Sequence, residues 1–82
     1  MRILLLARNR EWAAAWVYEH KLPTKLIHYV SQPKYAYSFN GLPYVVASPG
    51  PYHDEIKRIL GWGKCYEITP EQAKELVNNG NS

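Results

Sequence analysis

The sequence is short of cysteine and of long apolar runs. Its 82 residues include one cysteine, Cys65, so the chain cannot form an internal disulfide. This excludes the small secreted folds that disulfides stabilise and favours a reducing compartment. The apolar run over residues 3–7 ends at Arg8. That run is too short for the core of a signal peptide or for a membrane span, so we expect a cytoplasmic protein with no membrane partner.

The motifs of cofactor sites and of catalysis are also lacking. After the first apolar run, where a nucleotide-binding fold carries its glycine-rich loop, the chain reads Ala7-Arg8-Asn9-Arg10, so we expect no dinucleotide or nucleoside triphosphate cofactor. The three histidines lie far apart with no cysteine partner, which predicts no metal site. Cys65 is expected to pack as a small hydrophobe, and no Gly-x-Ser-x-Gly motif is present. We therefore expect a protein that is not an enzyme.

What is present is the pattern of one small α/β domain. Apolar runs predict strands near residues 2–7, 25–30, 43–48 and 64–68, and continuous rather than alternating runs are typical of parallel strands buried on both faces. Helical segments between them predict a small open, mostly parallel four-stranded sheet with helices on both faces, a degenerate half-Rossmann fold without a phosphate loop. We assign residues 1–77 to this domain and expect 78–82 to be a frayed C-terminal tail.

Capping residues mark where three of the helices begin. Asn9 is expected to cap the first helix and Asp54 the third, while Thr69 to Gln72 form a capping box before the last. The first helix is expected to bury a stripe that includes Trp12 and Trp16. The residues expected in the core are Leu4, Leu6, Trp16, Ile27, Val45, Val46, Ile56, Leu60 and Leu76.

Residues 31–42 allow two interpretations. Alternating aromatic residues running into Asn40-Gly41 indicate a β-hairpin. A short helix starting near Pro33 and ending near Gly41 is the alternative, and a parallel sheet needs a crossover of this length. We favour the helix.

Basic residues collect in the first half of the chain. Residues 1–45 hold six basic and two acidic side chains, whereas residues 46–82 hold four and five. If the strand order is 2-1-3-4, the carboxyl ends of strands one and three meet at the position where open parallel sheets bind ligands. The residues brought together there, and predicted to hold an anion or a nucleotide-like ligand, are Arg8, Asn9, Arg10, Ser48, Gly50, Tyr52, His53 and Asp54. The alternative is that the arginines are solvated and that Asp54 only caps a helix.

Aromatic side chains are more numerous than so small a core needs. Tyrosine alone occurs seven times, and Lys34, Tyr35 and Tyr37 are expected to form an exposed interaction surface. Exposed aromatic and basic side chains can anchor a protein interface or stack on single-stranded nucleic acid.

The chain resembles the small α/β accessory proteins encoded by actinobacteriophages. The resemblance rests on residues 3–8 leading into Trp12 and Trp16, on Leu22-Pro23, on residues 29–33, on Gly41-Leu42 and on residues 56–60, so it covers about residues 1–60. The resemblance implies a phage protein that is located inside the host cell and acts on a host or phage macromolecule. It implies no defined activity and carries over no functional residue.

Together these features predict a non-enzymatic macromolecular interaction module whose partner is a host or phage protein. The alternative is a domain that binds an anion, a nucleotide-like ligand or, weakly, nucleic acid at the basic rim after the first strand. The strand at 64–68 is expected at the edge of the sheet, where it could pair across a two-fold axis in a homodimer.

Overall fold

A computed structural model describes residues 2–80 of the chain. The strands are β1 (Ile3–Leu6), β2 (Ile27–Tyr29), β3 (Pro43–Val46) and β4 (Tyr66–Glu67). The helices are α1 (Arg10–Glu19), α2 (Pro33–Ala36), α3 (His53–Trp62) and α4 (Pro70–Gly80), with a 3₁₀ turn at Thr24–Leu26. Helix α4 thus continues three residues beyond its predicted end at Val77, and residues 81–82 of the expected tail lie outside the described residues.

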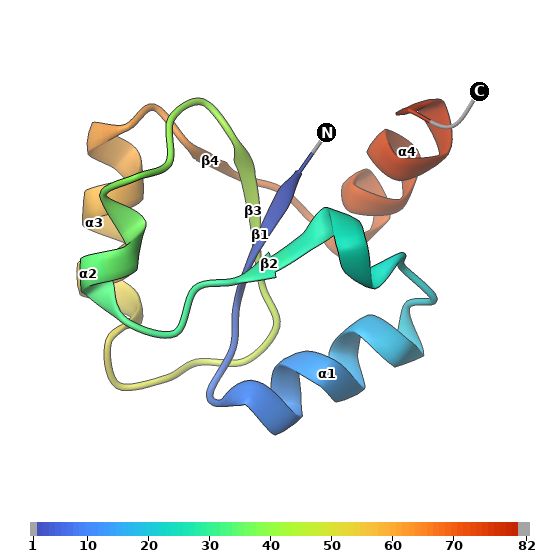
Figure 1. Cartoon of the computed structure of the whole chain (residues 1–82), viewed down its shortest axis with the longest axis horizontal. Helices are drawn as coiled ribbons and strands as arrows, with labels where there is room; N and C mark the ends of the chain where they lie inside the picture. Colours follow the sequence, from blue (N-terminus) through green and yellow to red (C-terminus); the bar gives the residue numbers. More distant parts are fainter. Residues whose placement is uncertain (1, 81–82) are drawn as a thin grey trace.

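The four strands form one parallel sheet in the order β2-β1-β3-β4. Leu5 pairs with Tyr29 on one side and with Val45 on the other, so β1 lies in the middle of the sheet with β3 (Figure 1). The predicted α/β class is confirmed, and every strand pair in the described sheet is parallel. The strand order is the 2-1-3-4 order on which the predicted rim site depended.

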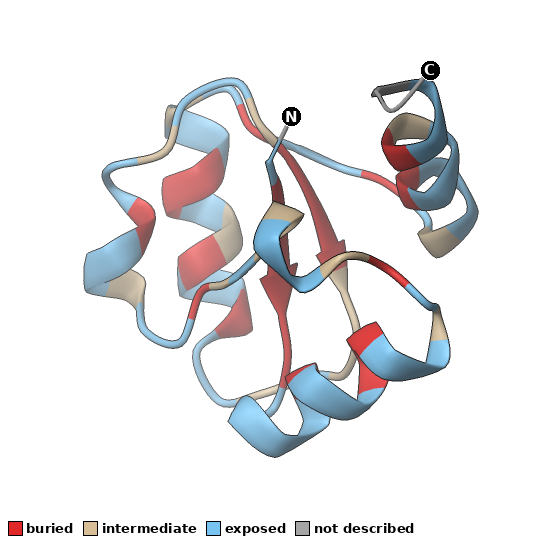
Figure 2. Cartoon of the chain, turned by 45° about the vertical axis from the view of Figure 1, so that its right-hand side comes forward, coloured by how far each residue is buried: buried red, intermediate tan, exposed pale blue. Residues whose placement is uncertain are grey.

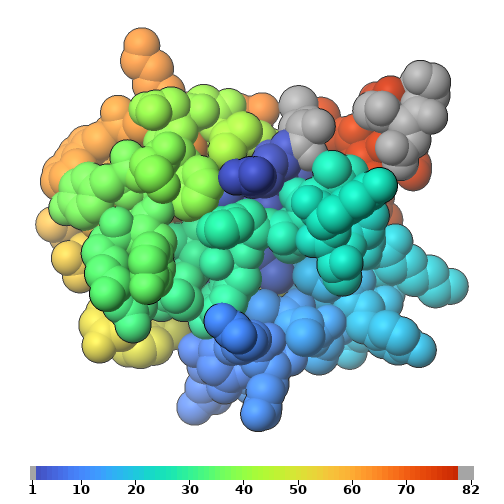
Figure 3. Space-filling view, viewed as in Figure 1, coloured from blue at the N-terminus to red at the C-terminus, as the bar shows by residue number. Residues whose placement is uncertain are grey.

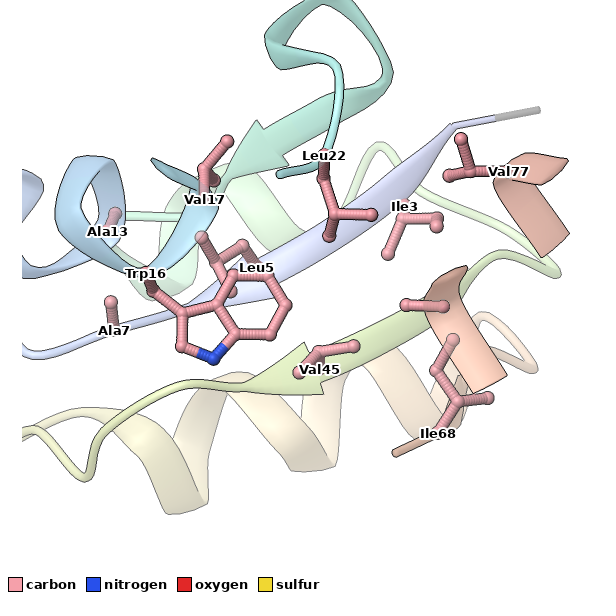
Figure 4. Packing of buried hydrophobic residues seen from close by; sticks show 11 residues of the cluster. Ile3, Leu5, Ala7, Ala13, Trp16, Val17, Leu22, Val45, Ile68 and Val77 are labelled. Atoms are coloured by element: carbon pink, nitrogen blue, oxygen red, sulfur yellow. The ribbon is translucent and has the colours of Figure 1, made fainter. Parts of the chain in front are cut away.

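Alternate side chains of β1 divide the core into two clusters. Ile3 and Leu5 face α1 and α4, whereas Leu4 and Leu6 face α2 and α3. All four residues of β1 are buried (Figure 2), because a central strand of a parallel sheet is covered on both faces. Figure 4 shows the first cluster, in which the Trp16 ring of α1 packs near Leu5 and Val45.

The sequence pattern misplaced several core residues. Ile27, Val46 and Leu76 are only partly buried, since β2 lies at the sheet edge and Val46 and Leu76 pack at the margin of the two clusters. Trp12 was expected in the buried stripe of α1 and is instead 53% exposed. The predicted core residues Leu4, Leu6, Trp16, Val45, Ile56 and Leu60 are buried, and Cys65 is buried as expected.

The crossover between β2 and β3 contains a helix rather than a hairpin. Helix α2 begins at Pro33, as predicted, but it ends at Ala36, well before Gly41. Gly41 instead has φ +67°, a conformation that glycine adopts most readily, and its N–H donates to the carbonyl of Gly63 at 2.7 Å. This turn fastens the crossover to the end of α3.

Two of the three predicted caps are present. The Asn9 side chain accepts a hydrogen bond from the N–H of Trp12 at 2.9 Å. Thr69 and Gln72 exchange the two hydrogen bonds of a capping box. Asp54 does not cap α3, because the helix starts at His53, two residues before the start that a cap at Asp54 would give. The residue before the helix, Tyr52, forms no side-chain cap.

Candidate functional site

The predicted rim site is partly assembled at the carboxyl ends of β1 and β3. The loop after β1 and the loop between β3 and α3 run side by side (Figure 1), and the N–H of Arg8 donates to the Ser48 hydroxyl at 2.9 Å. Beyond this bond, on the α3 side of the sheet, a cavity of about 90 Å³ is open to the surface. Its lining includes Arg8, Gly50, Tyr52 and His53 from the predicted set, and Ser31 from the end of β2.

Three members of the predicted set serve elsewhere. Asn9 uses its side chain to cap α1. Arg10 lines a separate groove on the other side of the sheet, so the two arginines do not line one cavity as predicted. Asp54 lies exposed in the first turn of α3 and does not line the cavity. Ser31 was not in the predicted set, although the 2-1-3-4 order assumed for that set also places the carboxyl end of β2 beside β1.

His53 is the unusual residue of this cavity. It is 9% exposed, and its Nε2 forms no hydrogen bond with any of residues 2–80. The ring packs against Gly50, where a Cβ would lie 3.3 Å from Nε2 and 3.4 Å from the Arg8 Cα. A buried polar atom without a partner costs free energy, so its presence points to an occupant that the protein does not itself supply.

A larger hollow lies on the opposite face, between α1 and β2. This groove has a volume of about 790 Å³ and is mainly apolar, with Leu5, Val17 and Ile27 among its lining residues. In Figure 3 it is visible as the recess between the blue helix and the teal strand, with the dark blue of β1 at its floor. Arg10 and Lys21 line it as well, and no carboxylate of the described chain does.

The groove was not predicted because periodicity shows only that α1 has one apolar side. The contrast between the apolar and the polar side of α1 is weak, because Ala14 and Ala15 are apolar residues that are exposed. Small side chains at the helix surface leave the space beside β2 open. That opening depends on the spacing between helix and sheet, which no local pattern reports.

The predicted aromatic surface is exposed. Tyr35 and Tyr37 are 49% and 64% exposed, and the Lys34 ammonium lies 5.2 Å from the Tyr35 ring centroid. Trp62 of α3 joins them, with its ring 6.5 Å from that of Tyr37. Trp62 was not predicted to belong to this surface, because it lies 25 residues beyond Tyr37 in the sequence. The two side chains meet only through the packing of α2 on α3.

No family model, no curated protein and no solved structure matches the chain. Within residues 2–80, no group of three or more histidine, cysteine, aspartate or glutamate side chains is placed to hold a metal ion. None of the described helices has both the length and the apolar character needed to cross a bilayer.

Proposed function

We propose that the chain is a non-catalytic interaction module that binds an acidic segment of a host or phage protein in the groove between α1 and β2. The observation that carries this proposal is the groove itself, which is open, about 790 Å³ in volume and lined mainly by apolar side chains. A concave site of several hundred Å³ lined mainly by apolar side chains is typical of a binding site.

The charges of the groove select the class of partner. Arg10 lies at one end of α1 and Lys21 just beyond the other, so a cation stands at each end of the apolar floor. An occupant with apolar side chains between acidic ones matches this pattern, because cations at the rim attract carboxylates and repel basic segments. The basic excess in residues 1–45 adds to this attraction at longer range.

The edge strand offers a second contact to the same occupant. Strand β2 pairs with β1 on one side only, and Ile27 and Tyr29 contribute to the groove lining. A segment lying in the groove therefore runs next to a strand edge, where extended peptides can add backbone hydrogen bonds.

Photo-crosslinking from neighbouring positions of α1 tests the proposal. Ala14 lines the groove, whereas Ala15 is also exposed on the same helix but does not line it. A benzophenone amino acid at residue 14, used in an actinobacterial lysate, should crosslink to an acidic segment that mass spectrometry identifies. The same group at residue 15 should not capture that segment.

The captured segment is then synthesised and titrated against charge variants. Reversing the rim charges with Arg10→Glu and Lys21→Glu should weaken binding about tenfold, since each exposed ion pair contributes up to about 1 kcal/mol. Arg58→Glu, an exposed change on α3, should leave affinity within about twofold after allowance for long-range charge. Equal capture from residues 14 and 15, no capture, or a segment that binds the reversed variant equally well would refute the proposal.

A further inference from the structure

The small cavity beside α3 carries an inference independent of the groove. We propose that it binds a tetrahedral oxyanion of the phosphate type, with the His53 imidazole donating a hydrogen bond from Nε2. The cavity lies at the carboxyl ends of β1 and β3, where the sheet's connections diverge to opposite faces, and this is the usual ligand position in open parallel sheets.

The unpartnered His53 Nε2 is the first support. The side chain is more than nine-tenths buried and lines the cavity, and its Nε2 has no hydrogen-bond partner among residues 2–80. An imidazole with its proton on Nε2, or an imidazolium, donates from this atom. An oxyanion oxygen in the cavity would satisfy it.

The other polar groups around the cavity are also donors. Arg8 carries a guanidinium, Ser31 and Tyr52 carry hydroxyls, and all three residues line the same space as His53. Arg8 is the cavity's charged lining residue, and no carboxylate of the described chain lines it. Charge-assisted hydrogen bonds from such a set favour an anion over a neutral ligand.

The start of α3 adds a partial positive charge. The helix is ten residues long and begins at His53, and no side chain caps its first amide groups. Uncapped N–H groups at a helix N-terminus attract anions. Asp54 and Glu55 follow in the first turn and oppose this attraction, but both are exposed and neither lines the cavity.

The size of the cavity limits the ligand. Its volume of about 90 Å³ corresponds to roughly three water molecules of liquid volume, which admits a phosphate group but not a nucleoside. The occupant is therefore either free phosphate or the phosphate group of a monoester whose remainder lies outside. Gly50 keeps the space open, since a Cβ there would project between the His53 ring and the Arg8 backbone.

Nuclear magnetic resonance of the ¹⁵N-labelled protein tests the site with inorganic phosphate at low ionic strength. We expect a saturable shift of the His53 Nε2 resonance, whereas the ring of His28, which lies exposed on β2 and packs against Phe39, should not respond. Sulfate should reproduce the shift and chloride should not. Comparison of phosphate with glycerol phosphate separates the two sources, because a monoester site binds the ester more tightly.

Variants that keep His53 complete the test. Arg8→Gln should weaken phosphate binding about tenfold, and Gly50→Ala should weaken it at least as much, because the added Cβ would lie 3.3 Å from the His53 Nε2. Arg58→Gln removes an equal charge outside the cavity and should leave the affinity within about twofold. Circular dichroism confirms that each variant folds.

Two results would overturn the proposal. One is a His53 Nε2 resonance that stays unchanged up to high phosphate concentration, as expected if the cavity holds water only. The other is a response that chloride reproduces or that Gly50→Ala retains. The groove proposal is separate, because its tests depend on Arg10 and Lys21 rather than on the residues of this cavity.

Discussion

Gly63 and Gly61 should respond in opposite ways to the same substitution. Gly63 follows the last residue of α3, and a Cβ built there would collide with the carbonyl oxygen of Phe39 and lie 3.2 Å from the Asn40 Oδ1. Gly61 lies within α3, and a Cβ there meets nothing within 4 Å. Each position would receive one methyl group, so the pair isolates the effect of the crossover that packs on the helix end.

The magnitudes follow from those contacts. The Phe39 carbonyl belongs to the backbone and cannot rotate away, so Gly63→Ala must displace the turn that includes the bond from the Gly41 N–H to the Gly63 carbonyl. Overpacking costs about 1–3 kcal/mol, and a lost hydrogen bond adds about 1 kcal/mol. Reduced freedom of the unfolded chain offsets about 0.5 kcal/mol, so we expect a net loss of about 1.5–3.5 kcal/mol.

Gly61→Ala should raise the free energy of unfolding by about 0.5–1 kcal/mol, because alanine loses less backbone entropy in a helix and meets no obstacle here. Urea denaturation followed by circular dichroism measures both changes. In thermal melts, each kcal/mol should correspond to about 4–8 °C in a domain of this size. Equal stability of the two variants would show that the crossover does not pack on Gly63, and the arrangement of α2 and α3 would then be wrong.

Three further predictions test the core, a cap and a buried tyrosine. Leu4→Ala should cost about 2–5 kcal/mol because Leu4 is fully buried, whereas mutation of the partly buried Val46 to alanine should cost less than half as much. Equal losses in urea melts would contradict the difference in burial between these two positions. Asn9→Ala should cost about 1 kcal/mol through loss of the cap, with no loss expected if the Trp12 N–H is bonded by water equally well. Burial, aided by the charge of Glu67 and opposed by that of Lys57, raises the pKa of Tyr44 above 10.0. The tyrosine therefore loses its proton at lower pH in the unfolded chain than in the folded protein, so the free energy of unfolding should fall as the pH rises above about 10. Tyr44→Phe should remove this part of the fall in melts at graded pH.

The sequence by itself determined the class of the fold. The continuous apolar run of β1, followed by a capped helix, predicts a strand covered on both faces, and this is what Ile3–Leu6 forms. The caps at Asn9 and at Thr69 were readable because they depend on residues at most three positions apart. Asp54 was misread for a related reason, since a helix start shifted by two residues turns a capping side chain into an ordinary first-turn side chain.

Only the tertiary structure decided what the candidate sites contain. Arg8 and Arg10 are two residues apart in sequence, yet one lines the cavity beside α3 and the other the groove beside β2, because the sheet separates the two faces at that point. Ser31 lines the cavity from the loop after β2, and Trp62 meets Tyr37 through helix packing. The unpartnered Nε2 of His53 depends on every group around it, so no local pattern could reveal it.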